Sequence, residues 1–347
     1  MKYRQLGNTD IQVSLLTLGT MTFGEQNTQD EAFAQMDYAI TQGVNTIDVA
    51  EMYPVPPKNT TYGESEAIVG RWLAARGQRE DKIIATKVTG NGLHNPGFEY
   101  IRGGPRLSAQ QIKQAVDNSL QRLQTDYIDL YQLHWPERKT NFFGSLGYTH
   151  YPDDGVALAE SLMTLAELVK LGKIRHFGLS NETPWGVLES LRVASQHNIA
   201  QPVSIQNPYN LLNRSYEVGL AEISIREKIG LLAYSPLAFG MLSGKYYGGA
   251  RPEQSRLALY QRFSRYTNQY AEAAADAYVD LAREYQVDPA AMALAFINRQ
   301  AFVTSNIIGA TSIEQLQVNI ASVDVDLDNE LLQRIEAIHQ QYSNPGP

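Results

Sequence analysis

The segment Val44-Asn45-Thr46-Ile47-Asp48-Val49-Ala50-Glu51-Met52-Tyr53 places a carboxylate and a phenol at the end of a short apolar run. Residues 44–49 are β-branched or apolar, follow the turn signal Gln42-Gly43 and precede a proline-rich loop, a pattern that predicts a short buried strand. Asp48 is therefore expected near the carboxyl end of that strand, with Tyr53 in the loop that leaves it. A buried carboxylate needs a cationic or hydrogen-bonding partner.

Apolar runs and segments of helical period alternate along the whole chain. The predicted strands are 13–19, 44–49, 82–88, 128–135, 174–180, 203–206, 230–235 and 303–309, and the predicted helices are 28–41, 64–75, 108–123, 158–171, 184–197, 215–227, 270–299, 312–320 and 328–341. Because this alternation has no break, it favours an α/β fold of the (β/α)8 TIM-barrel type over an open doubly wound sheet. No linker is visible, so residues 1–347 are expected to form one domain.

Residues 2–14 predict a β-hairpin ahead of the barrel, and three helices carry recognisable start signals. Thr28 and Ser108 can cap their helices, as can Thr311 or Ser312, with Glu314 placed as in a capping box after Thr311.

Two loops, 89–107 and 137–156, exceed the 2–6 residues usual for such connections, and both follow strands on the side where barrels carry their chemistry. The second loop contains Phe142, Phe143, Tyr148 and Tyr151. These rings are expected to pack the loop onto the barrel, and the alternative is a wall around a substrate.

Composition narrows the class of protein. The 347 residues are 43% hydrophobic and 19% charged, with a formal charge of −8 and no cysteine. This profile predicts a soluble globular protein and argues against non-specific nucleic-acid binding, which needs a clustered basic surface. No apolar run approaches the ~20 residues that span a bilayer, so the cytoplasm is the expected location and no membrane partner is predicted. The oligomeric state is open.

Two further polar side chains end the next strands of the predicted barrel. Lys87 lies in an apolar run at the end of the third strand, and His134 lies at the end of the fourth. A buried lysine is rare unless it is paired, and Asp48 on the neighbouring strand is the natural counter-ion. A phenol beside that ammonium should have a lowered pKa, which would make Tyr53 a usable general acid, while His134 could hydrogen-bond a carbonyl oxygen. Four such groups at adjacent strand ends predict an active site.

These residues resemble the motif of the aldo-keto reductase superfamily, and the chain looks closest to its bacterial Tas-type branch from Tyr3 to about the final helix. The motif of Asp, four residues, Tyr, then Lys and His on the next strands is present as Asp48, Tyr53, Lys87 and His134. The resemblance implies an NADP(H)-dependent oxidoreductase that reduces an aldehyde or ketone. In such an enzyme Tyr53 would protonate the carbonyl oxygen while the nicotinamide supplies hydride.

A second tyrosine competes for the role of the acid. The family usually passes directly from the catalytic tyrosine to a Gly-x-Ser-Glu helix start, and Tyr62-Gly63-Glu64-Ser65-Glu66 has this local pattern. Residues 54–61 then look like an insertion. Tyr53 is preferred because its spacing from Asp48 lets the phenol, Asp48 and Lys87 converge, and Tyr62 is the alternative.

The loops after strands seven and eight often bind phosphate in such barrels. The loop after strand seven is predicted to bind the cofactor through Ser235, Leu237, Gly240 and Lys245, because small residues let backbone amides approach a pyrophosphate and Lys245 adds charge. It is one residue short of a Walker A motif, which argues against nucleotide hydrolysis, and no Rossmann glycine pattern follows any strand. Six histidines are scattered without ligand spacing, so no metal site is predicted.

The resemblance implies further cofactor contacts, which the family motifs assign by position. They are Gly19, Thr20 and Met21 after strand one, Asp48, Ser180 and Asn181 after strand five, Gln206, Tyr234, Arg256, and Gly309, Thr311, Gln315 and Asn319 after strand eight. The family often has Arg at Gln315 and Glu at Val318, departures for which Arg256 could compensate. NADP(H) is therefore expected, with NAD(H) as the alternative.

Two other functions fit parts of the sequence. The segment Gly309-Ala310-Thr311-Ser312 echoes the nicotinamide-binding β subunits of potassium channels, which suggests a regulatory module with little turnover. Lys87 could also form a Schiff base, as in barrel aldolases. Pairing with Asp48 argues against this second alternative, because a protonated lysine is a poor nucleophile.

Overall fold

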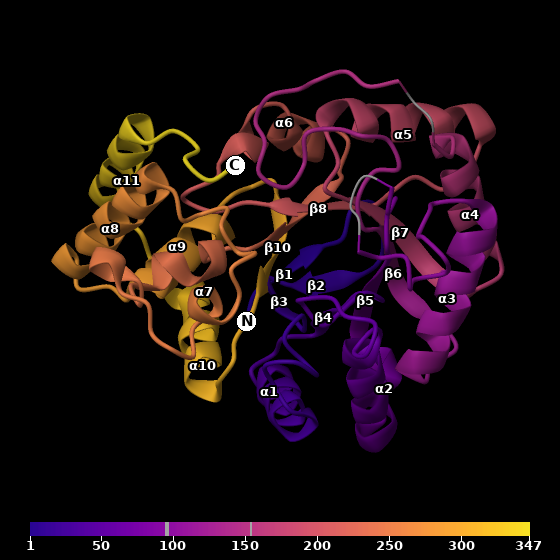
Figure 1. Ribbon diagram of the computed structural model, residues 1–347, viewed down its shortest axis with the longest axis horizontal. Helices are drawn as coiled ribbons and strands as arrows, with labels where there is room; N and C mark the ends of the chain where they lie inside the picture. Colours follow the sequence, from indigo (N-terminus) through magenta and orange to yellow (C-terminus); the bar gives the residue numbers. More distant parts are fainter. Residues whose placement is uncertain (94–96, 153–154) are drawn as a thin grey trace.

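The chain folds into a closed barrel of eight parallel strands surrounded by helices, as a computed structural model of residues 1–93, 97–152 and 155–347 describes (Figure 1). The strands, neighbours in the order β10-β3-β4-β5-β6-β7-β8-β9, are β3 (Leu16–Gly19), β4 (Thr46–Asp48), β5 (Ile83–Val88), β6 (Ile128–Leu133), β7 (Ile174–Ser180), β8 (Ser204–Pro208), β9 (Gly230–Tyr234) and β10 (Val303–Ile308). The predicted TIM barrel is thus confirmed.

The helices lie outside the barrel. They are α1 (Gln29–Thr41), α2 (Glu64–Arg76), α3 (Ala109–Leu123), α4 (Leu158–Lys170), α5 (Pro184–His197), α6 (Leu220–Arg226), α7 (Arg256–Leu259), α8 (Gln269–Glu284), α9 (Pro289–Asn298), α10 (Ile313–Ala321) and α11 (Asn329–Gln341). None of the helices in the described part of the chain is both long and apolar enough to cross a lipid bilayer.

Strand alternation decides which side chains enter the barrel. On β5, Ile83 and Ala85 pack in the inner cluster, whereas Ile84 and Val88 join the large core between strands and helices. Because side chains of a strand alternate between two faces, Lys87 continues the inner row. It therefore reaches the upper end of the barrel interior, above Ala85.

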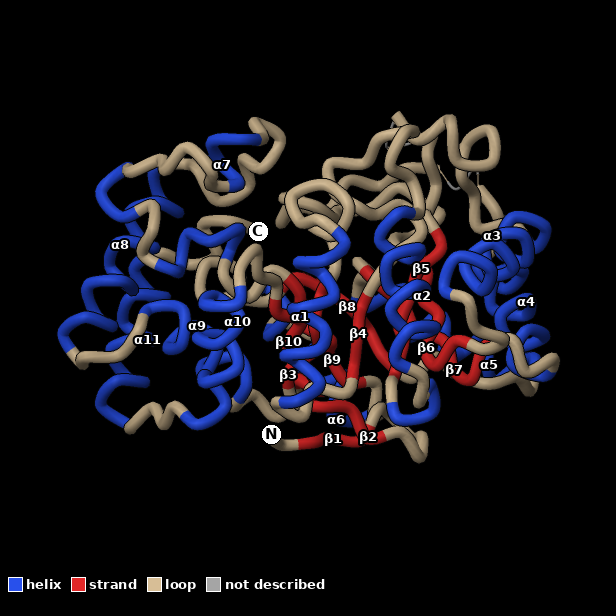
Figure 2. Tube along the Cα trace, turned by 90° about the horizontal axis from the view of Figure 1, so that it is seen from below, coloured by secondary structure: helices blue, strands red, loops and turns tan. Residues whose placement is uncertain are grey.

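The predicted hairpin is present as β1 (Tyr3–Gln5) and β2 (Gln12–Ser14), which pair antiparallel. Its residues Leu6, Ile11 and Val13 extend the inner cluster, so the hairpin plugs the amino-terminal end of the barrel. Figure 2 shows the hairpin at one end and the long loops at the other. The site predicted at the carboxyl ends of the strands is therefore on the face that the hairpin leaves open.

Several predicted boundaries are wrong. The run 13–19 is divided between β2 and β3, and the segment 270–299 is two helices, because Pro289 starts α9 and the Asp288 side chain caps it by accepting from the Ala291 amide. The segment 215–227 is also interrupted: Gly219, with φ 98°, separates a 3-10 turn (Ser215–Glu217) from α6. In both segments the helical spacing of apolar residues continues across the interruption, but the proline or glycine ends the helix at that point.

The predicted caps at Thr28 and Ser108 are confirmed by bonds from the amides of Glu31 and Gln111. At α10 the cap is Ser312, and the proposed capping box of Thr311 with Glu314 is wrong. Instead, the Gln315 side chain accepts a hydrogen bond of 3.1 Å from the Thr311 amide.

Candidate active site

Asp48 and Lys87 form a buried ion pair at the open end of the barrel. The Lys87 Nζ donates to Asp48 Oδ2 at 2.6 Å and to the carbonyl oxygen of Val49 at 2.7 Å, and the Lys87 side chain is fully buried. Burial lowers the pKa of Lys87, while the carboxylate of Asp48 acts in the opposite direction. Two strong acceptors on one ammonium favour its charged form.

Two glutamine side chains complete the environment of Asp48. Gln206 Nε2 donates to Asp48 Oδ1 at 2.8 Å, and Gln132 Nε2 lies 3.4 Å from the same oxygen. Gln132 is the register partner of Lys87 on the next strand, so both point into the barrel. The sequence analysis did not identify Gln132, although a glutamine within an apolar strand is a signal of a buried polar contact.

Tyr53 lies above this ion pair. The Lys87 Nζ is 4.9 Å from the centroid of the Tyr53 ring, and the His134 ring meets Tyr53 edge-on at 5.8 Å. Lys87 thus faces the ring rather than the hydroxyl. Burial, and secondly the charge of Asp48, raise the pKa of Tyr53 well above its ordinary value. The expectation of a lowered pKa is wrong in this structure, because desolvation and the carboxylate act together against the phenolate.

His134 is buried and uncharged. Burial, and secondly the charge of Lys87, hold the pKa of His134 well below its ordinary value. Its Nδ1 has no hydrogen-bond partner among the described residues. A neutral imidazole with an unsatisfied nitrogen can still accept or donate a hydrogen bond to a bound molecule.

Tyr62 belongs to a different polar cluster. Its hydroxyl donates to Glu51 Oε2 at 3.2 Å, and the guanidinium of Arg122 lies 5.2 Å from its ring centroid. Glu51 is fully buried and is held by both terminal nitrogens of Arg102, which ties the loop 89–107 to the end of β4. The structure therefore brings Tyr53, and not Tyr62, next to Lys87.

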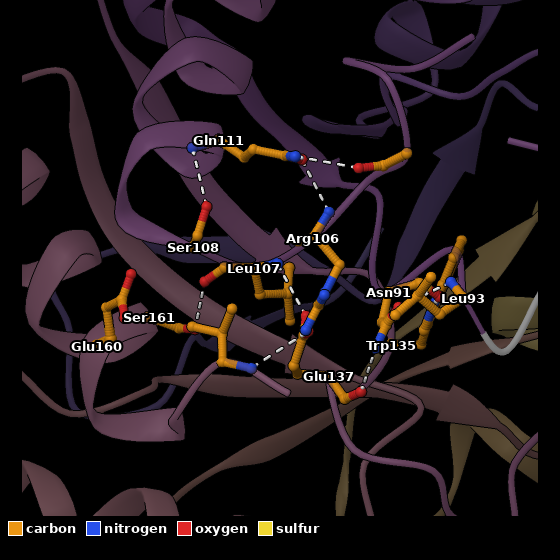
Figure 3. A network of polar contacts seen from close by, with 12 residues as sticks. Asn91, Leu93, Arg106, Leu107, Ser108, Gln111, Trp135, Glu137, Glu160 and Ser161 are labelled. Atoms are coloured by element: carbon orange, nitrogen blue, oxygen red, sulfur yellow. Dashed lines mark hydrogen bonds and ion pairs between the residues drawn. The ribbon is translucent and has the colours of Figure 1, made fainter. Parts of the chain in front are cut away.

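The two long loops share one anchor, shown in Figure 3. The Glu137 carboxylate accepts from Arg106 Nε, from the Leu107 amide at 2.9 Å and from the Val156 amide at 3.3 Å. Nearby, Asn91 Nδ2 donates to the Glu137 carbonyl oxygen at 3.0 Å. One buried carboxylate thus joins both ends of the loop 137–156 to the loop 89–107.

The aromatic residues of the second loop divide into two groups. Phe142 packs against the cluster that contains Trp135, in agreement with the expected packing role. Phe143 is 43% exposed, but its ring meets Trp135 edge-on at 6.1 Å, so it also packs onto the barrel end. The side chains of Tyr148 and Tyr151 are 63% and 38% exposed, so the packing expectation does not hold for them.

The residues proposed for the nicotinamide end surround the same opening. Tyr234 donates its hydroxyl to Asn181 Oδ1 at 2.6 Å, and Asn181 Nδ2 donates to the His134 carbonyl oxygen at 2.8 Å. The Ser180 hydroxyl donates to the carbonyl oxygen of Gln206 at 2.8 Å. On the other side, the Thr20 hydroxyl donates to the Asp48 carbonyl oxygen at 3.0 Å, with Gly19 and Met21 beside it in the chain.

The loop after β9 has the features of a phosphate site. Ser235, Ala238 and Phe239 have φ values of 54°, 48° and 59°, and backbone strain of this kind gathers at functional sites. Gly240 has a φ of 97°, which favours glycine, and a Cβ there would lie 2.6 Å from Cε of Lys245, so this lysine passes close to the loop backbone. Leu237 lies within the same loop.

Two cations near this loop lack carboxylate partners among the described residues. Lys245 and Arg256 lie close enough to repel each other, and only tyrosines act on them as opposing groups. After the neighbouring strand β10, Gly309 is exposed, with no atom within 4 Å of a Cβ placed on it, and Asn319 Nδ2 donates to its carbonyl oxygen at 3.1 Å. This arrangement fits a ligand with several phosphates.

Residues 15–340 match the model of the aldo/keto reductase family, and the chain belongs to this family. It is 52% identical to Protein tas of Escherichia coli (strain K12) over 349 aligned residues that cover all of both chains. It is also 39% identical to an aldo-keto reductase of Babesia bovis over 280 residues, covering 76% of this chain and 97% of the relative. The uncharacterized oxidoreductase YrpG of Bacillus subtilis (strain 168) is 33% identical over 360 residues, covering 100% of this chain and 97% of the relative. The protein is an oxidoreductase that uses a nicotinamide cofactor.

Proposed function

We propose that the protein reduces the carbonyl group of an aldehyde or ketone with NADPH, and that Tyr53 is the proton donor. The observation that carries this proposal is the convergence of Tyr53, His134 and the Asp48–Lys87 pair on the one end of the barrel that the hairpin leaves open. Bound NADPH would supply the hydride.

The raised pKa of Tyr53 keeps the phenol protonated at neutral pH but weakens it as an acid, so its proposed role as proton donor rests on its position beside Lys87 and His134. Lys87 below the ring stabilises it through a cation–π contact and can favour the developing phenolate as the proton leaves. The neutral His134 orients the carbonyl oxygen with its free nitrogen.

Lys245 and Arg256 are proposed to hold the phosphates of the cofactor. Gly309, Thr311, Gln315 and Asn319 are proposed to hold its adenosine end, and Asn181, Gln206 and Tyr234 its nicotinamide end. The positive charge of Lys245 and Arg256, which no described carboxylate neutralises, supports NADPH over NADH, because a 2′-phosphate adds negative charge for these residues to bind.

The test compares Tyr53→Phe with Tyr62→Phe. Wild-type protein should oxidise NADPH with benzaldehyde, and Tyr53→Phe should lower kcat by about 10²–10⁴-fold. Its affinity for NADPH, measured by fluorescence quenching, should remain unchanged. Tyr62→Phe should keep most of the turnover, and the reverse ranking would identify Tyr62 as the acid.

The same assay tests whether the protein catalyses carbonyl reduction at all. If the wild-type protein binds NADPH but oxidises it with none of a panel of aldehydes and ketones, the alternative of a nicotinamide-binding regulatory module replaces this proposal.

A further inference from the structure

Arg265 is a partly buried cation for which the described residues provide no carboxylate partner. Two other arginines near the open end of the barrel have carboxylate partners: Arg102 pairs with Glu51 and Arg122 with Glu66. Among the described residues no carboxylate pairs with Arg265, and its Nη1 is buried without a hydrogen-bond partner. Tyr234 and Tyr266 satisfy part of the guanidinium, but a buried donor without an acceptor is costly, so Nη1 is suited to bind an anion from outside the chain.

Aromatic rings hold this guanidinium in place. Its central carbon lies 5.8 Å from the ring centroid of Phe143, 6.0 Å from that of Phe239 and 5.9 Å from that of Tyr266. Contacts with ring faces stabilise the cation without using up its N–H donors. The arginine is therefore oriented by these rings and by hydrogen bonding to Tyr234 and Tyr266, while its Nη1 remains without an acceptor among the described residues.

Arg265 lies between Tyr234, at the proposed nicotinamide end of the site, and Phe143 of the second long loop. Arg265 interacts with the hydroxyl of Tyr234, which is bonded through Asn181 to the His134 backbone. On its other side is Phe143, whose ring meets Trp135 edge-on at 6.1 Å. Two side chains, Tyr234 and Asn181, thus connect Arg265 to the backbone of His134.

A different pair of cations serves the phosphate loop. Arg256 is also 6.0 Å from the centroid of Phe239, but its electrostatic neighbours are Lys245, Tyr246 and Tyr260. Arg265 interacts with Tyr234 and Tyr266 instead. The two arginines therefore have separate surroundings, and the phosphate loop does not require Arg265.

We propose that Arg265 binds a carboxylate of the substrate, so that the preferred substrates are carbonyl compounds carrying a carboxylate on an apolar or aromatic body. This inference rests on the proposed carbonyl reduction. A guanidinium matches a carboxylate with two parallel N–H···O bonds, and the rings of Phe143 and Trp135 would contact the body of the molecule.

The experiment uses matched substrates: 2-, 3- and 4-carboxybenzaldehyde and their methyl esters, which lack the charge. For at least one isomer, wild-type kcat/KM should favour the acid over the ester by about tenfold or more. Arg265→Met should lower kcat/KM for that acid by about 10–100-fold and change the ester less than threefold, with partial recovery in Arg265→Lys. Arg262→Met, at an exposed arginine of the same segment, should change neither value.

The outcomes separate this inference from the proposed reaction. Equal losses with acid and ester, together with weaker NADPH binding in Arg265→Met, would assign Arg265 to the cofactor and overturn the proposal. If wild-type protein reduces no carbonyl compound, the anion site is tested by calorimetry instead. The affinities of the acids and of the esters for the NADP⁺-loaded protein are then compared. A preference for an acid that Arg265→Met abolishes supports the anion site, and no preference refutes it. Arg265→Gln replaces the Met variant if the latter fails to fold.

Discussion

Gln206 and Asp48 meet across the mouth of the barrel, with Gln206 Nε2 2.8 Å from Asp48 Oδ1. Their strands, β8 and β4, lie four positions apart in a closed ring of eight, so the side chains come from opposite walls. Asp48 is thus held by Gln206 from one side and by Lys87 from its own neighbouring strand. The Asp48 carboxylate thus joins side chains from opposite walls of the barrel at the centre of the proposed site.

Asp48→Asn should destabilise the fold strongly. The variant leaves the fully buried Lys87 without its counter-ion, and removal of one partner of a buried pair typically costs about 3–5 kcal/mol. Urea unfolding at pH 7 measures the loss. Asp117→Asn, which removes an exposed pair with Lys173, should cost at most about 1 kcal/mol. Similar losses in both variants would mean that Lys87 is not confined as described.

His134 should make stability fall at acidic pH. Because its pKa in the folded protein lies below the ordinary value of about 6.5, the unfolded chain binds the proton first. The histidine therefore has no effect above that value, and below it favours unfolding by up to about 1.4 kcal/mol per pH unit. The free energy of unfolding of His134→Gln, relative to wild type, should rise by this slope from pH 6.5 to 5. His197→Gln, at an exposed position, is the control, and parallel curves for wild type and His134→Gln would contradict the prediction.

Glu137→Gln should loosen both long loops. The carboxylate accepts from the amides of Leu107 and Val156, and charge-assisted bonds of this kind contribute about 1.5–3 kcal/mol. Hydrogen exchange at these two amides should therefore accelerate by about 10–100-fold, while the barrel strands keep their protection. Glu167→Gln, which removes only an exposed pair with Lys113, should leave both amides unchanged.

Arg256→Met should weaken NADPH binding more than NADH binding. If its unpaired guanidinium contacts the 2′-phosphate, the dissociation constant for NADPH should rise by about 10–100-fold, and that for NADH should change little. Arg251→Met provides a control, because Arg251 is already paired with Glu272. Equal effects on both cofactors would place Arg256 at the shared pyrophosphate instead.

Much of the architecture could be predicted from local patterns. The alternation of apolar runs and helical periods indicated eight strand–helix pairs, since each pattern reflects which face of an element is buried. Boundaries failed where one residue interrupts a continuous pattern, as Pro289 does between α8 and α9. Likewise, the expected pKa of Tyr53 was wrong, because desolvation by neighbours distant in sequence outweighs the nearby ammonium.

The sequence by itself determined the strand ends that carry Asp48, Lys87 and His134, because parallel strands of a barrel present their carboxyl ends at one rim. Only the tertiary structure decided that Lys87 faces the ring of Tyr53, that Glu137 joins both long loops and that Arg265 lies among aromatic rings, with no carboxylate partner in the described part of the chain. These contacts join residues from separate loops and strands, and their geometry depends on how the loops fold over the barrel, which no local periodicity encodes.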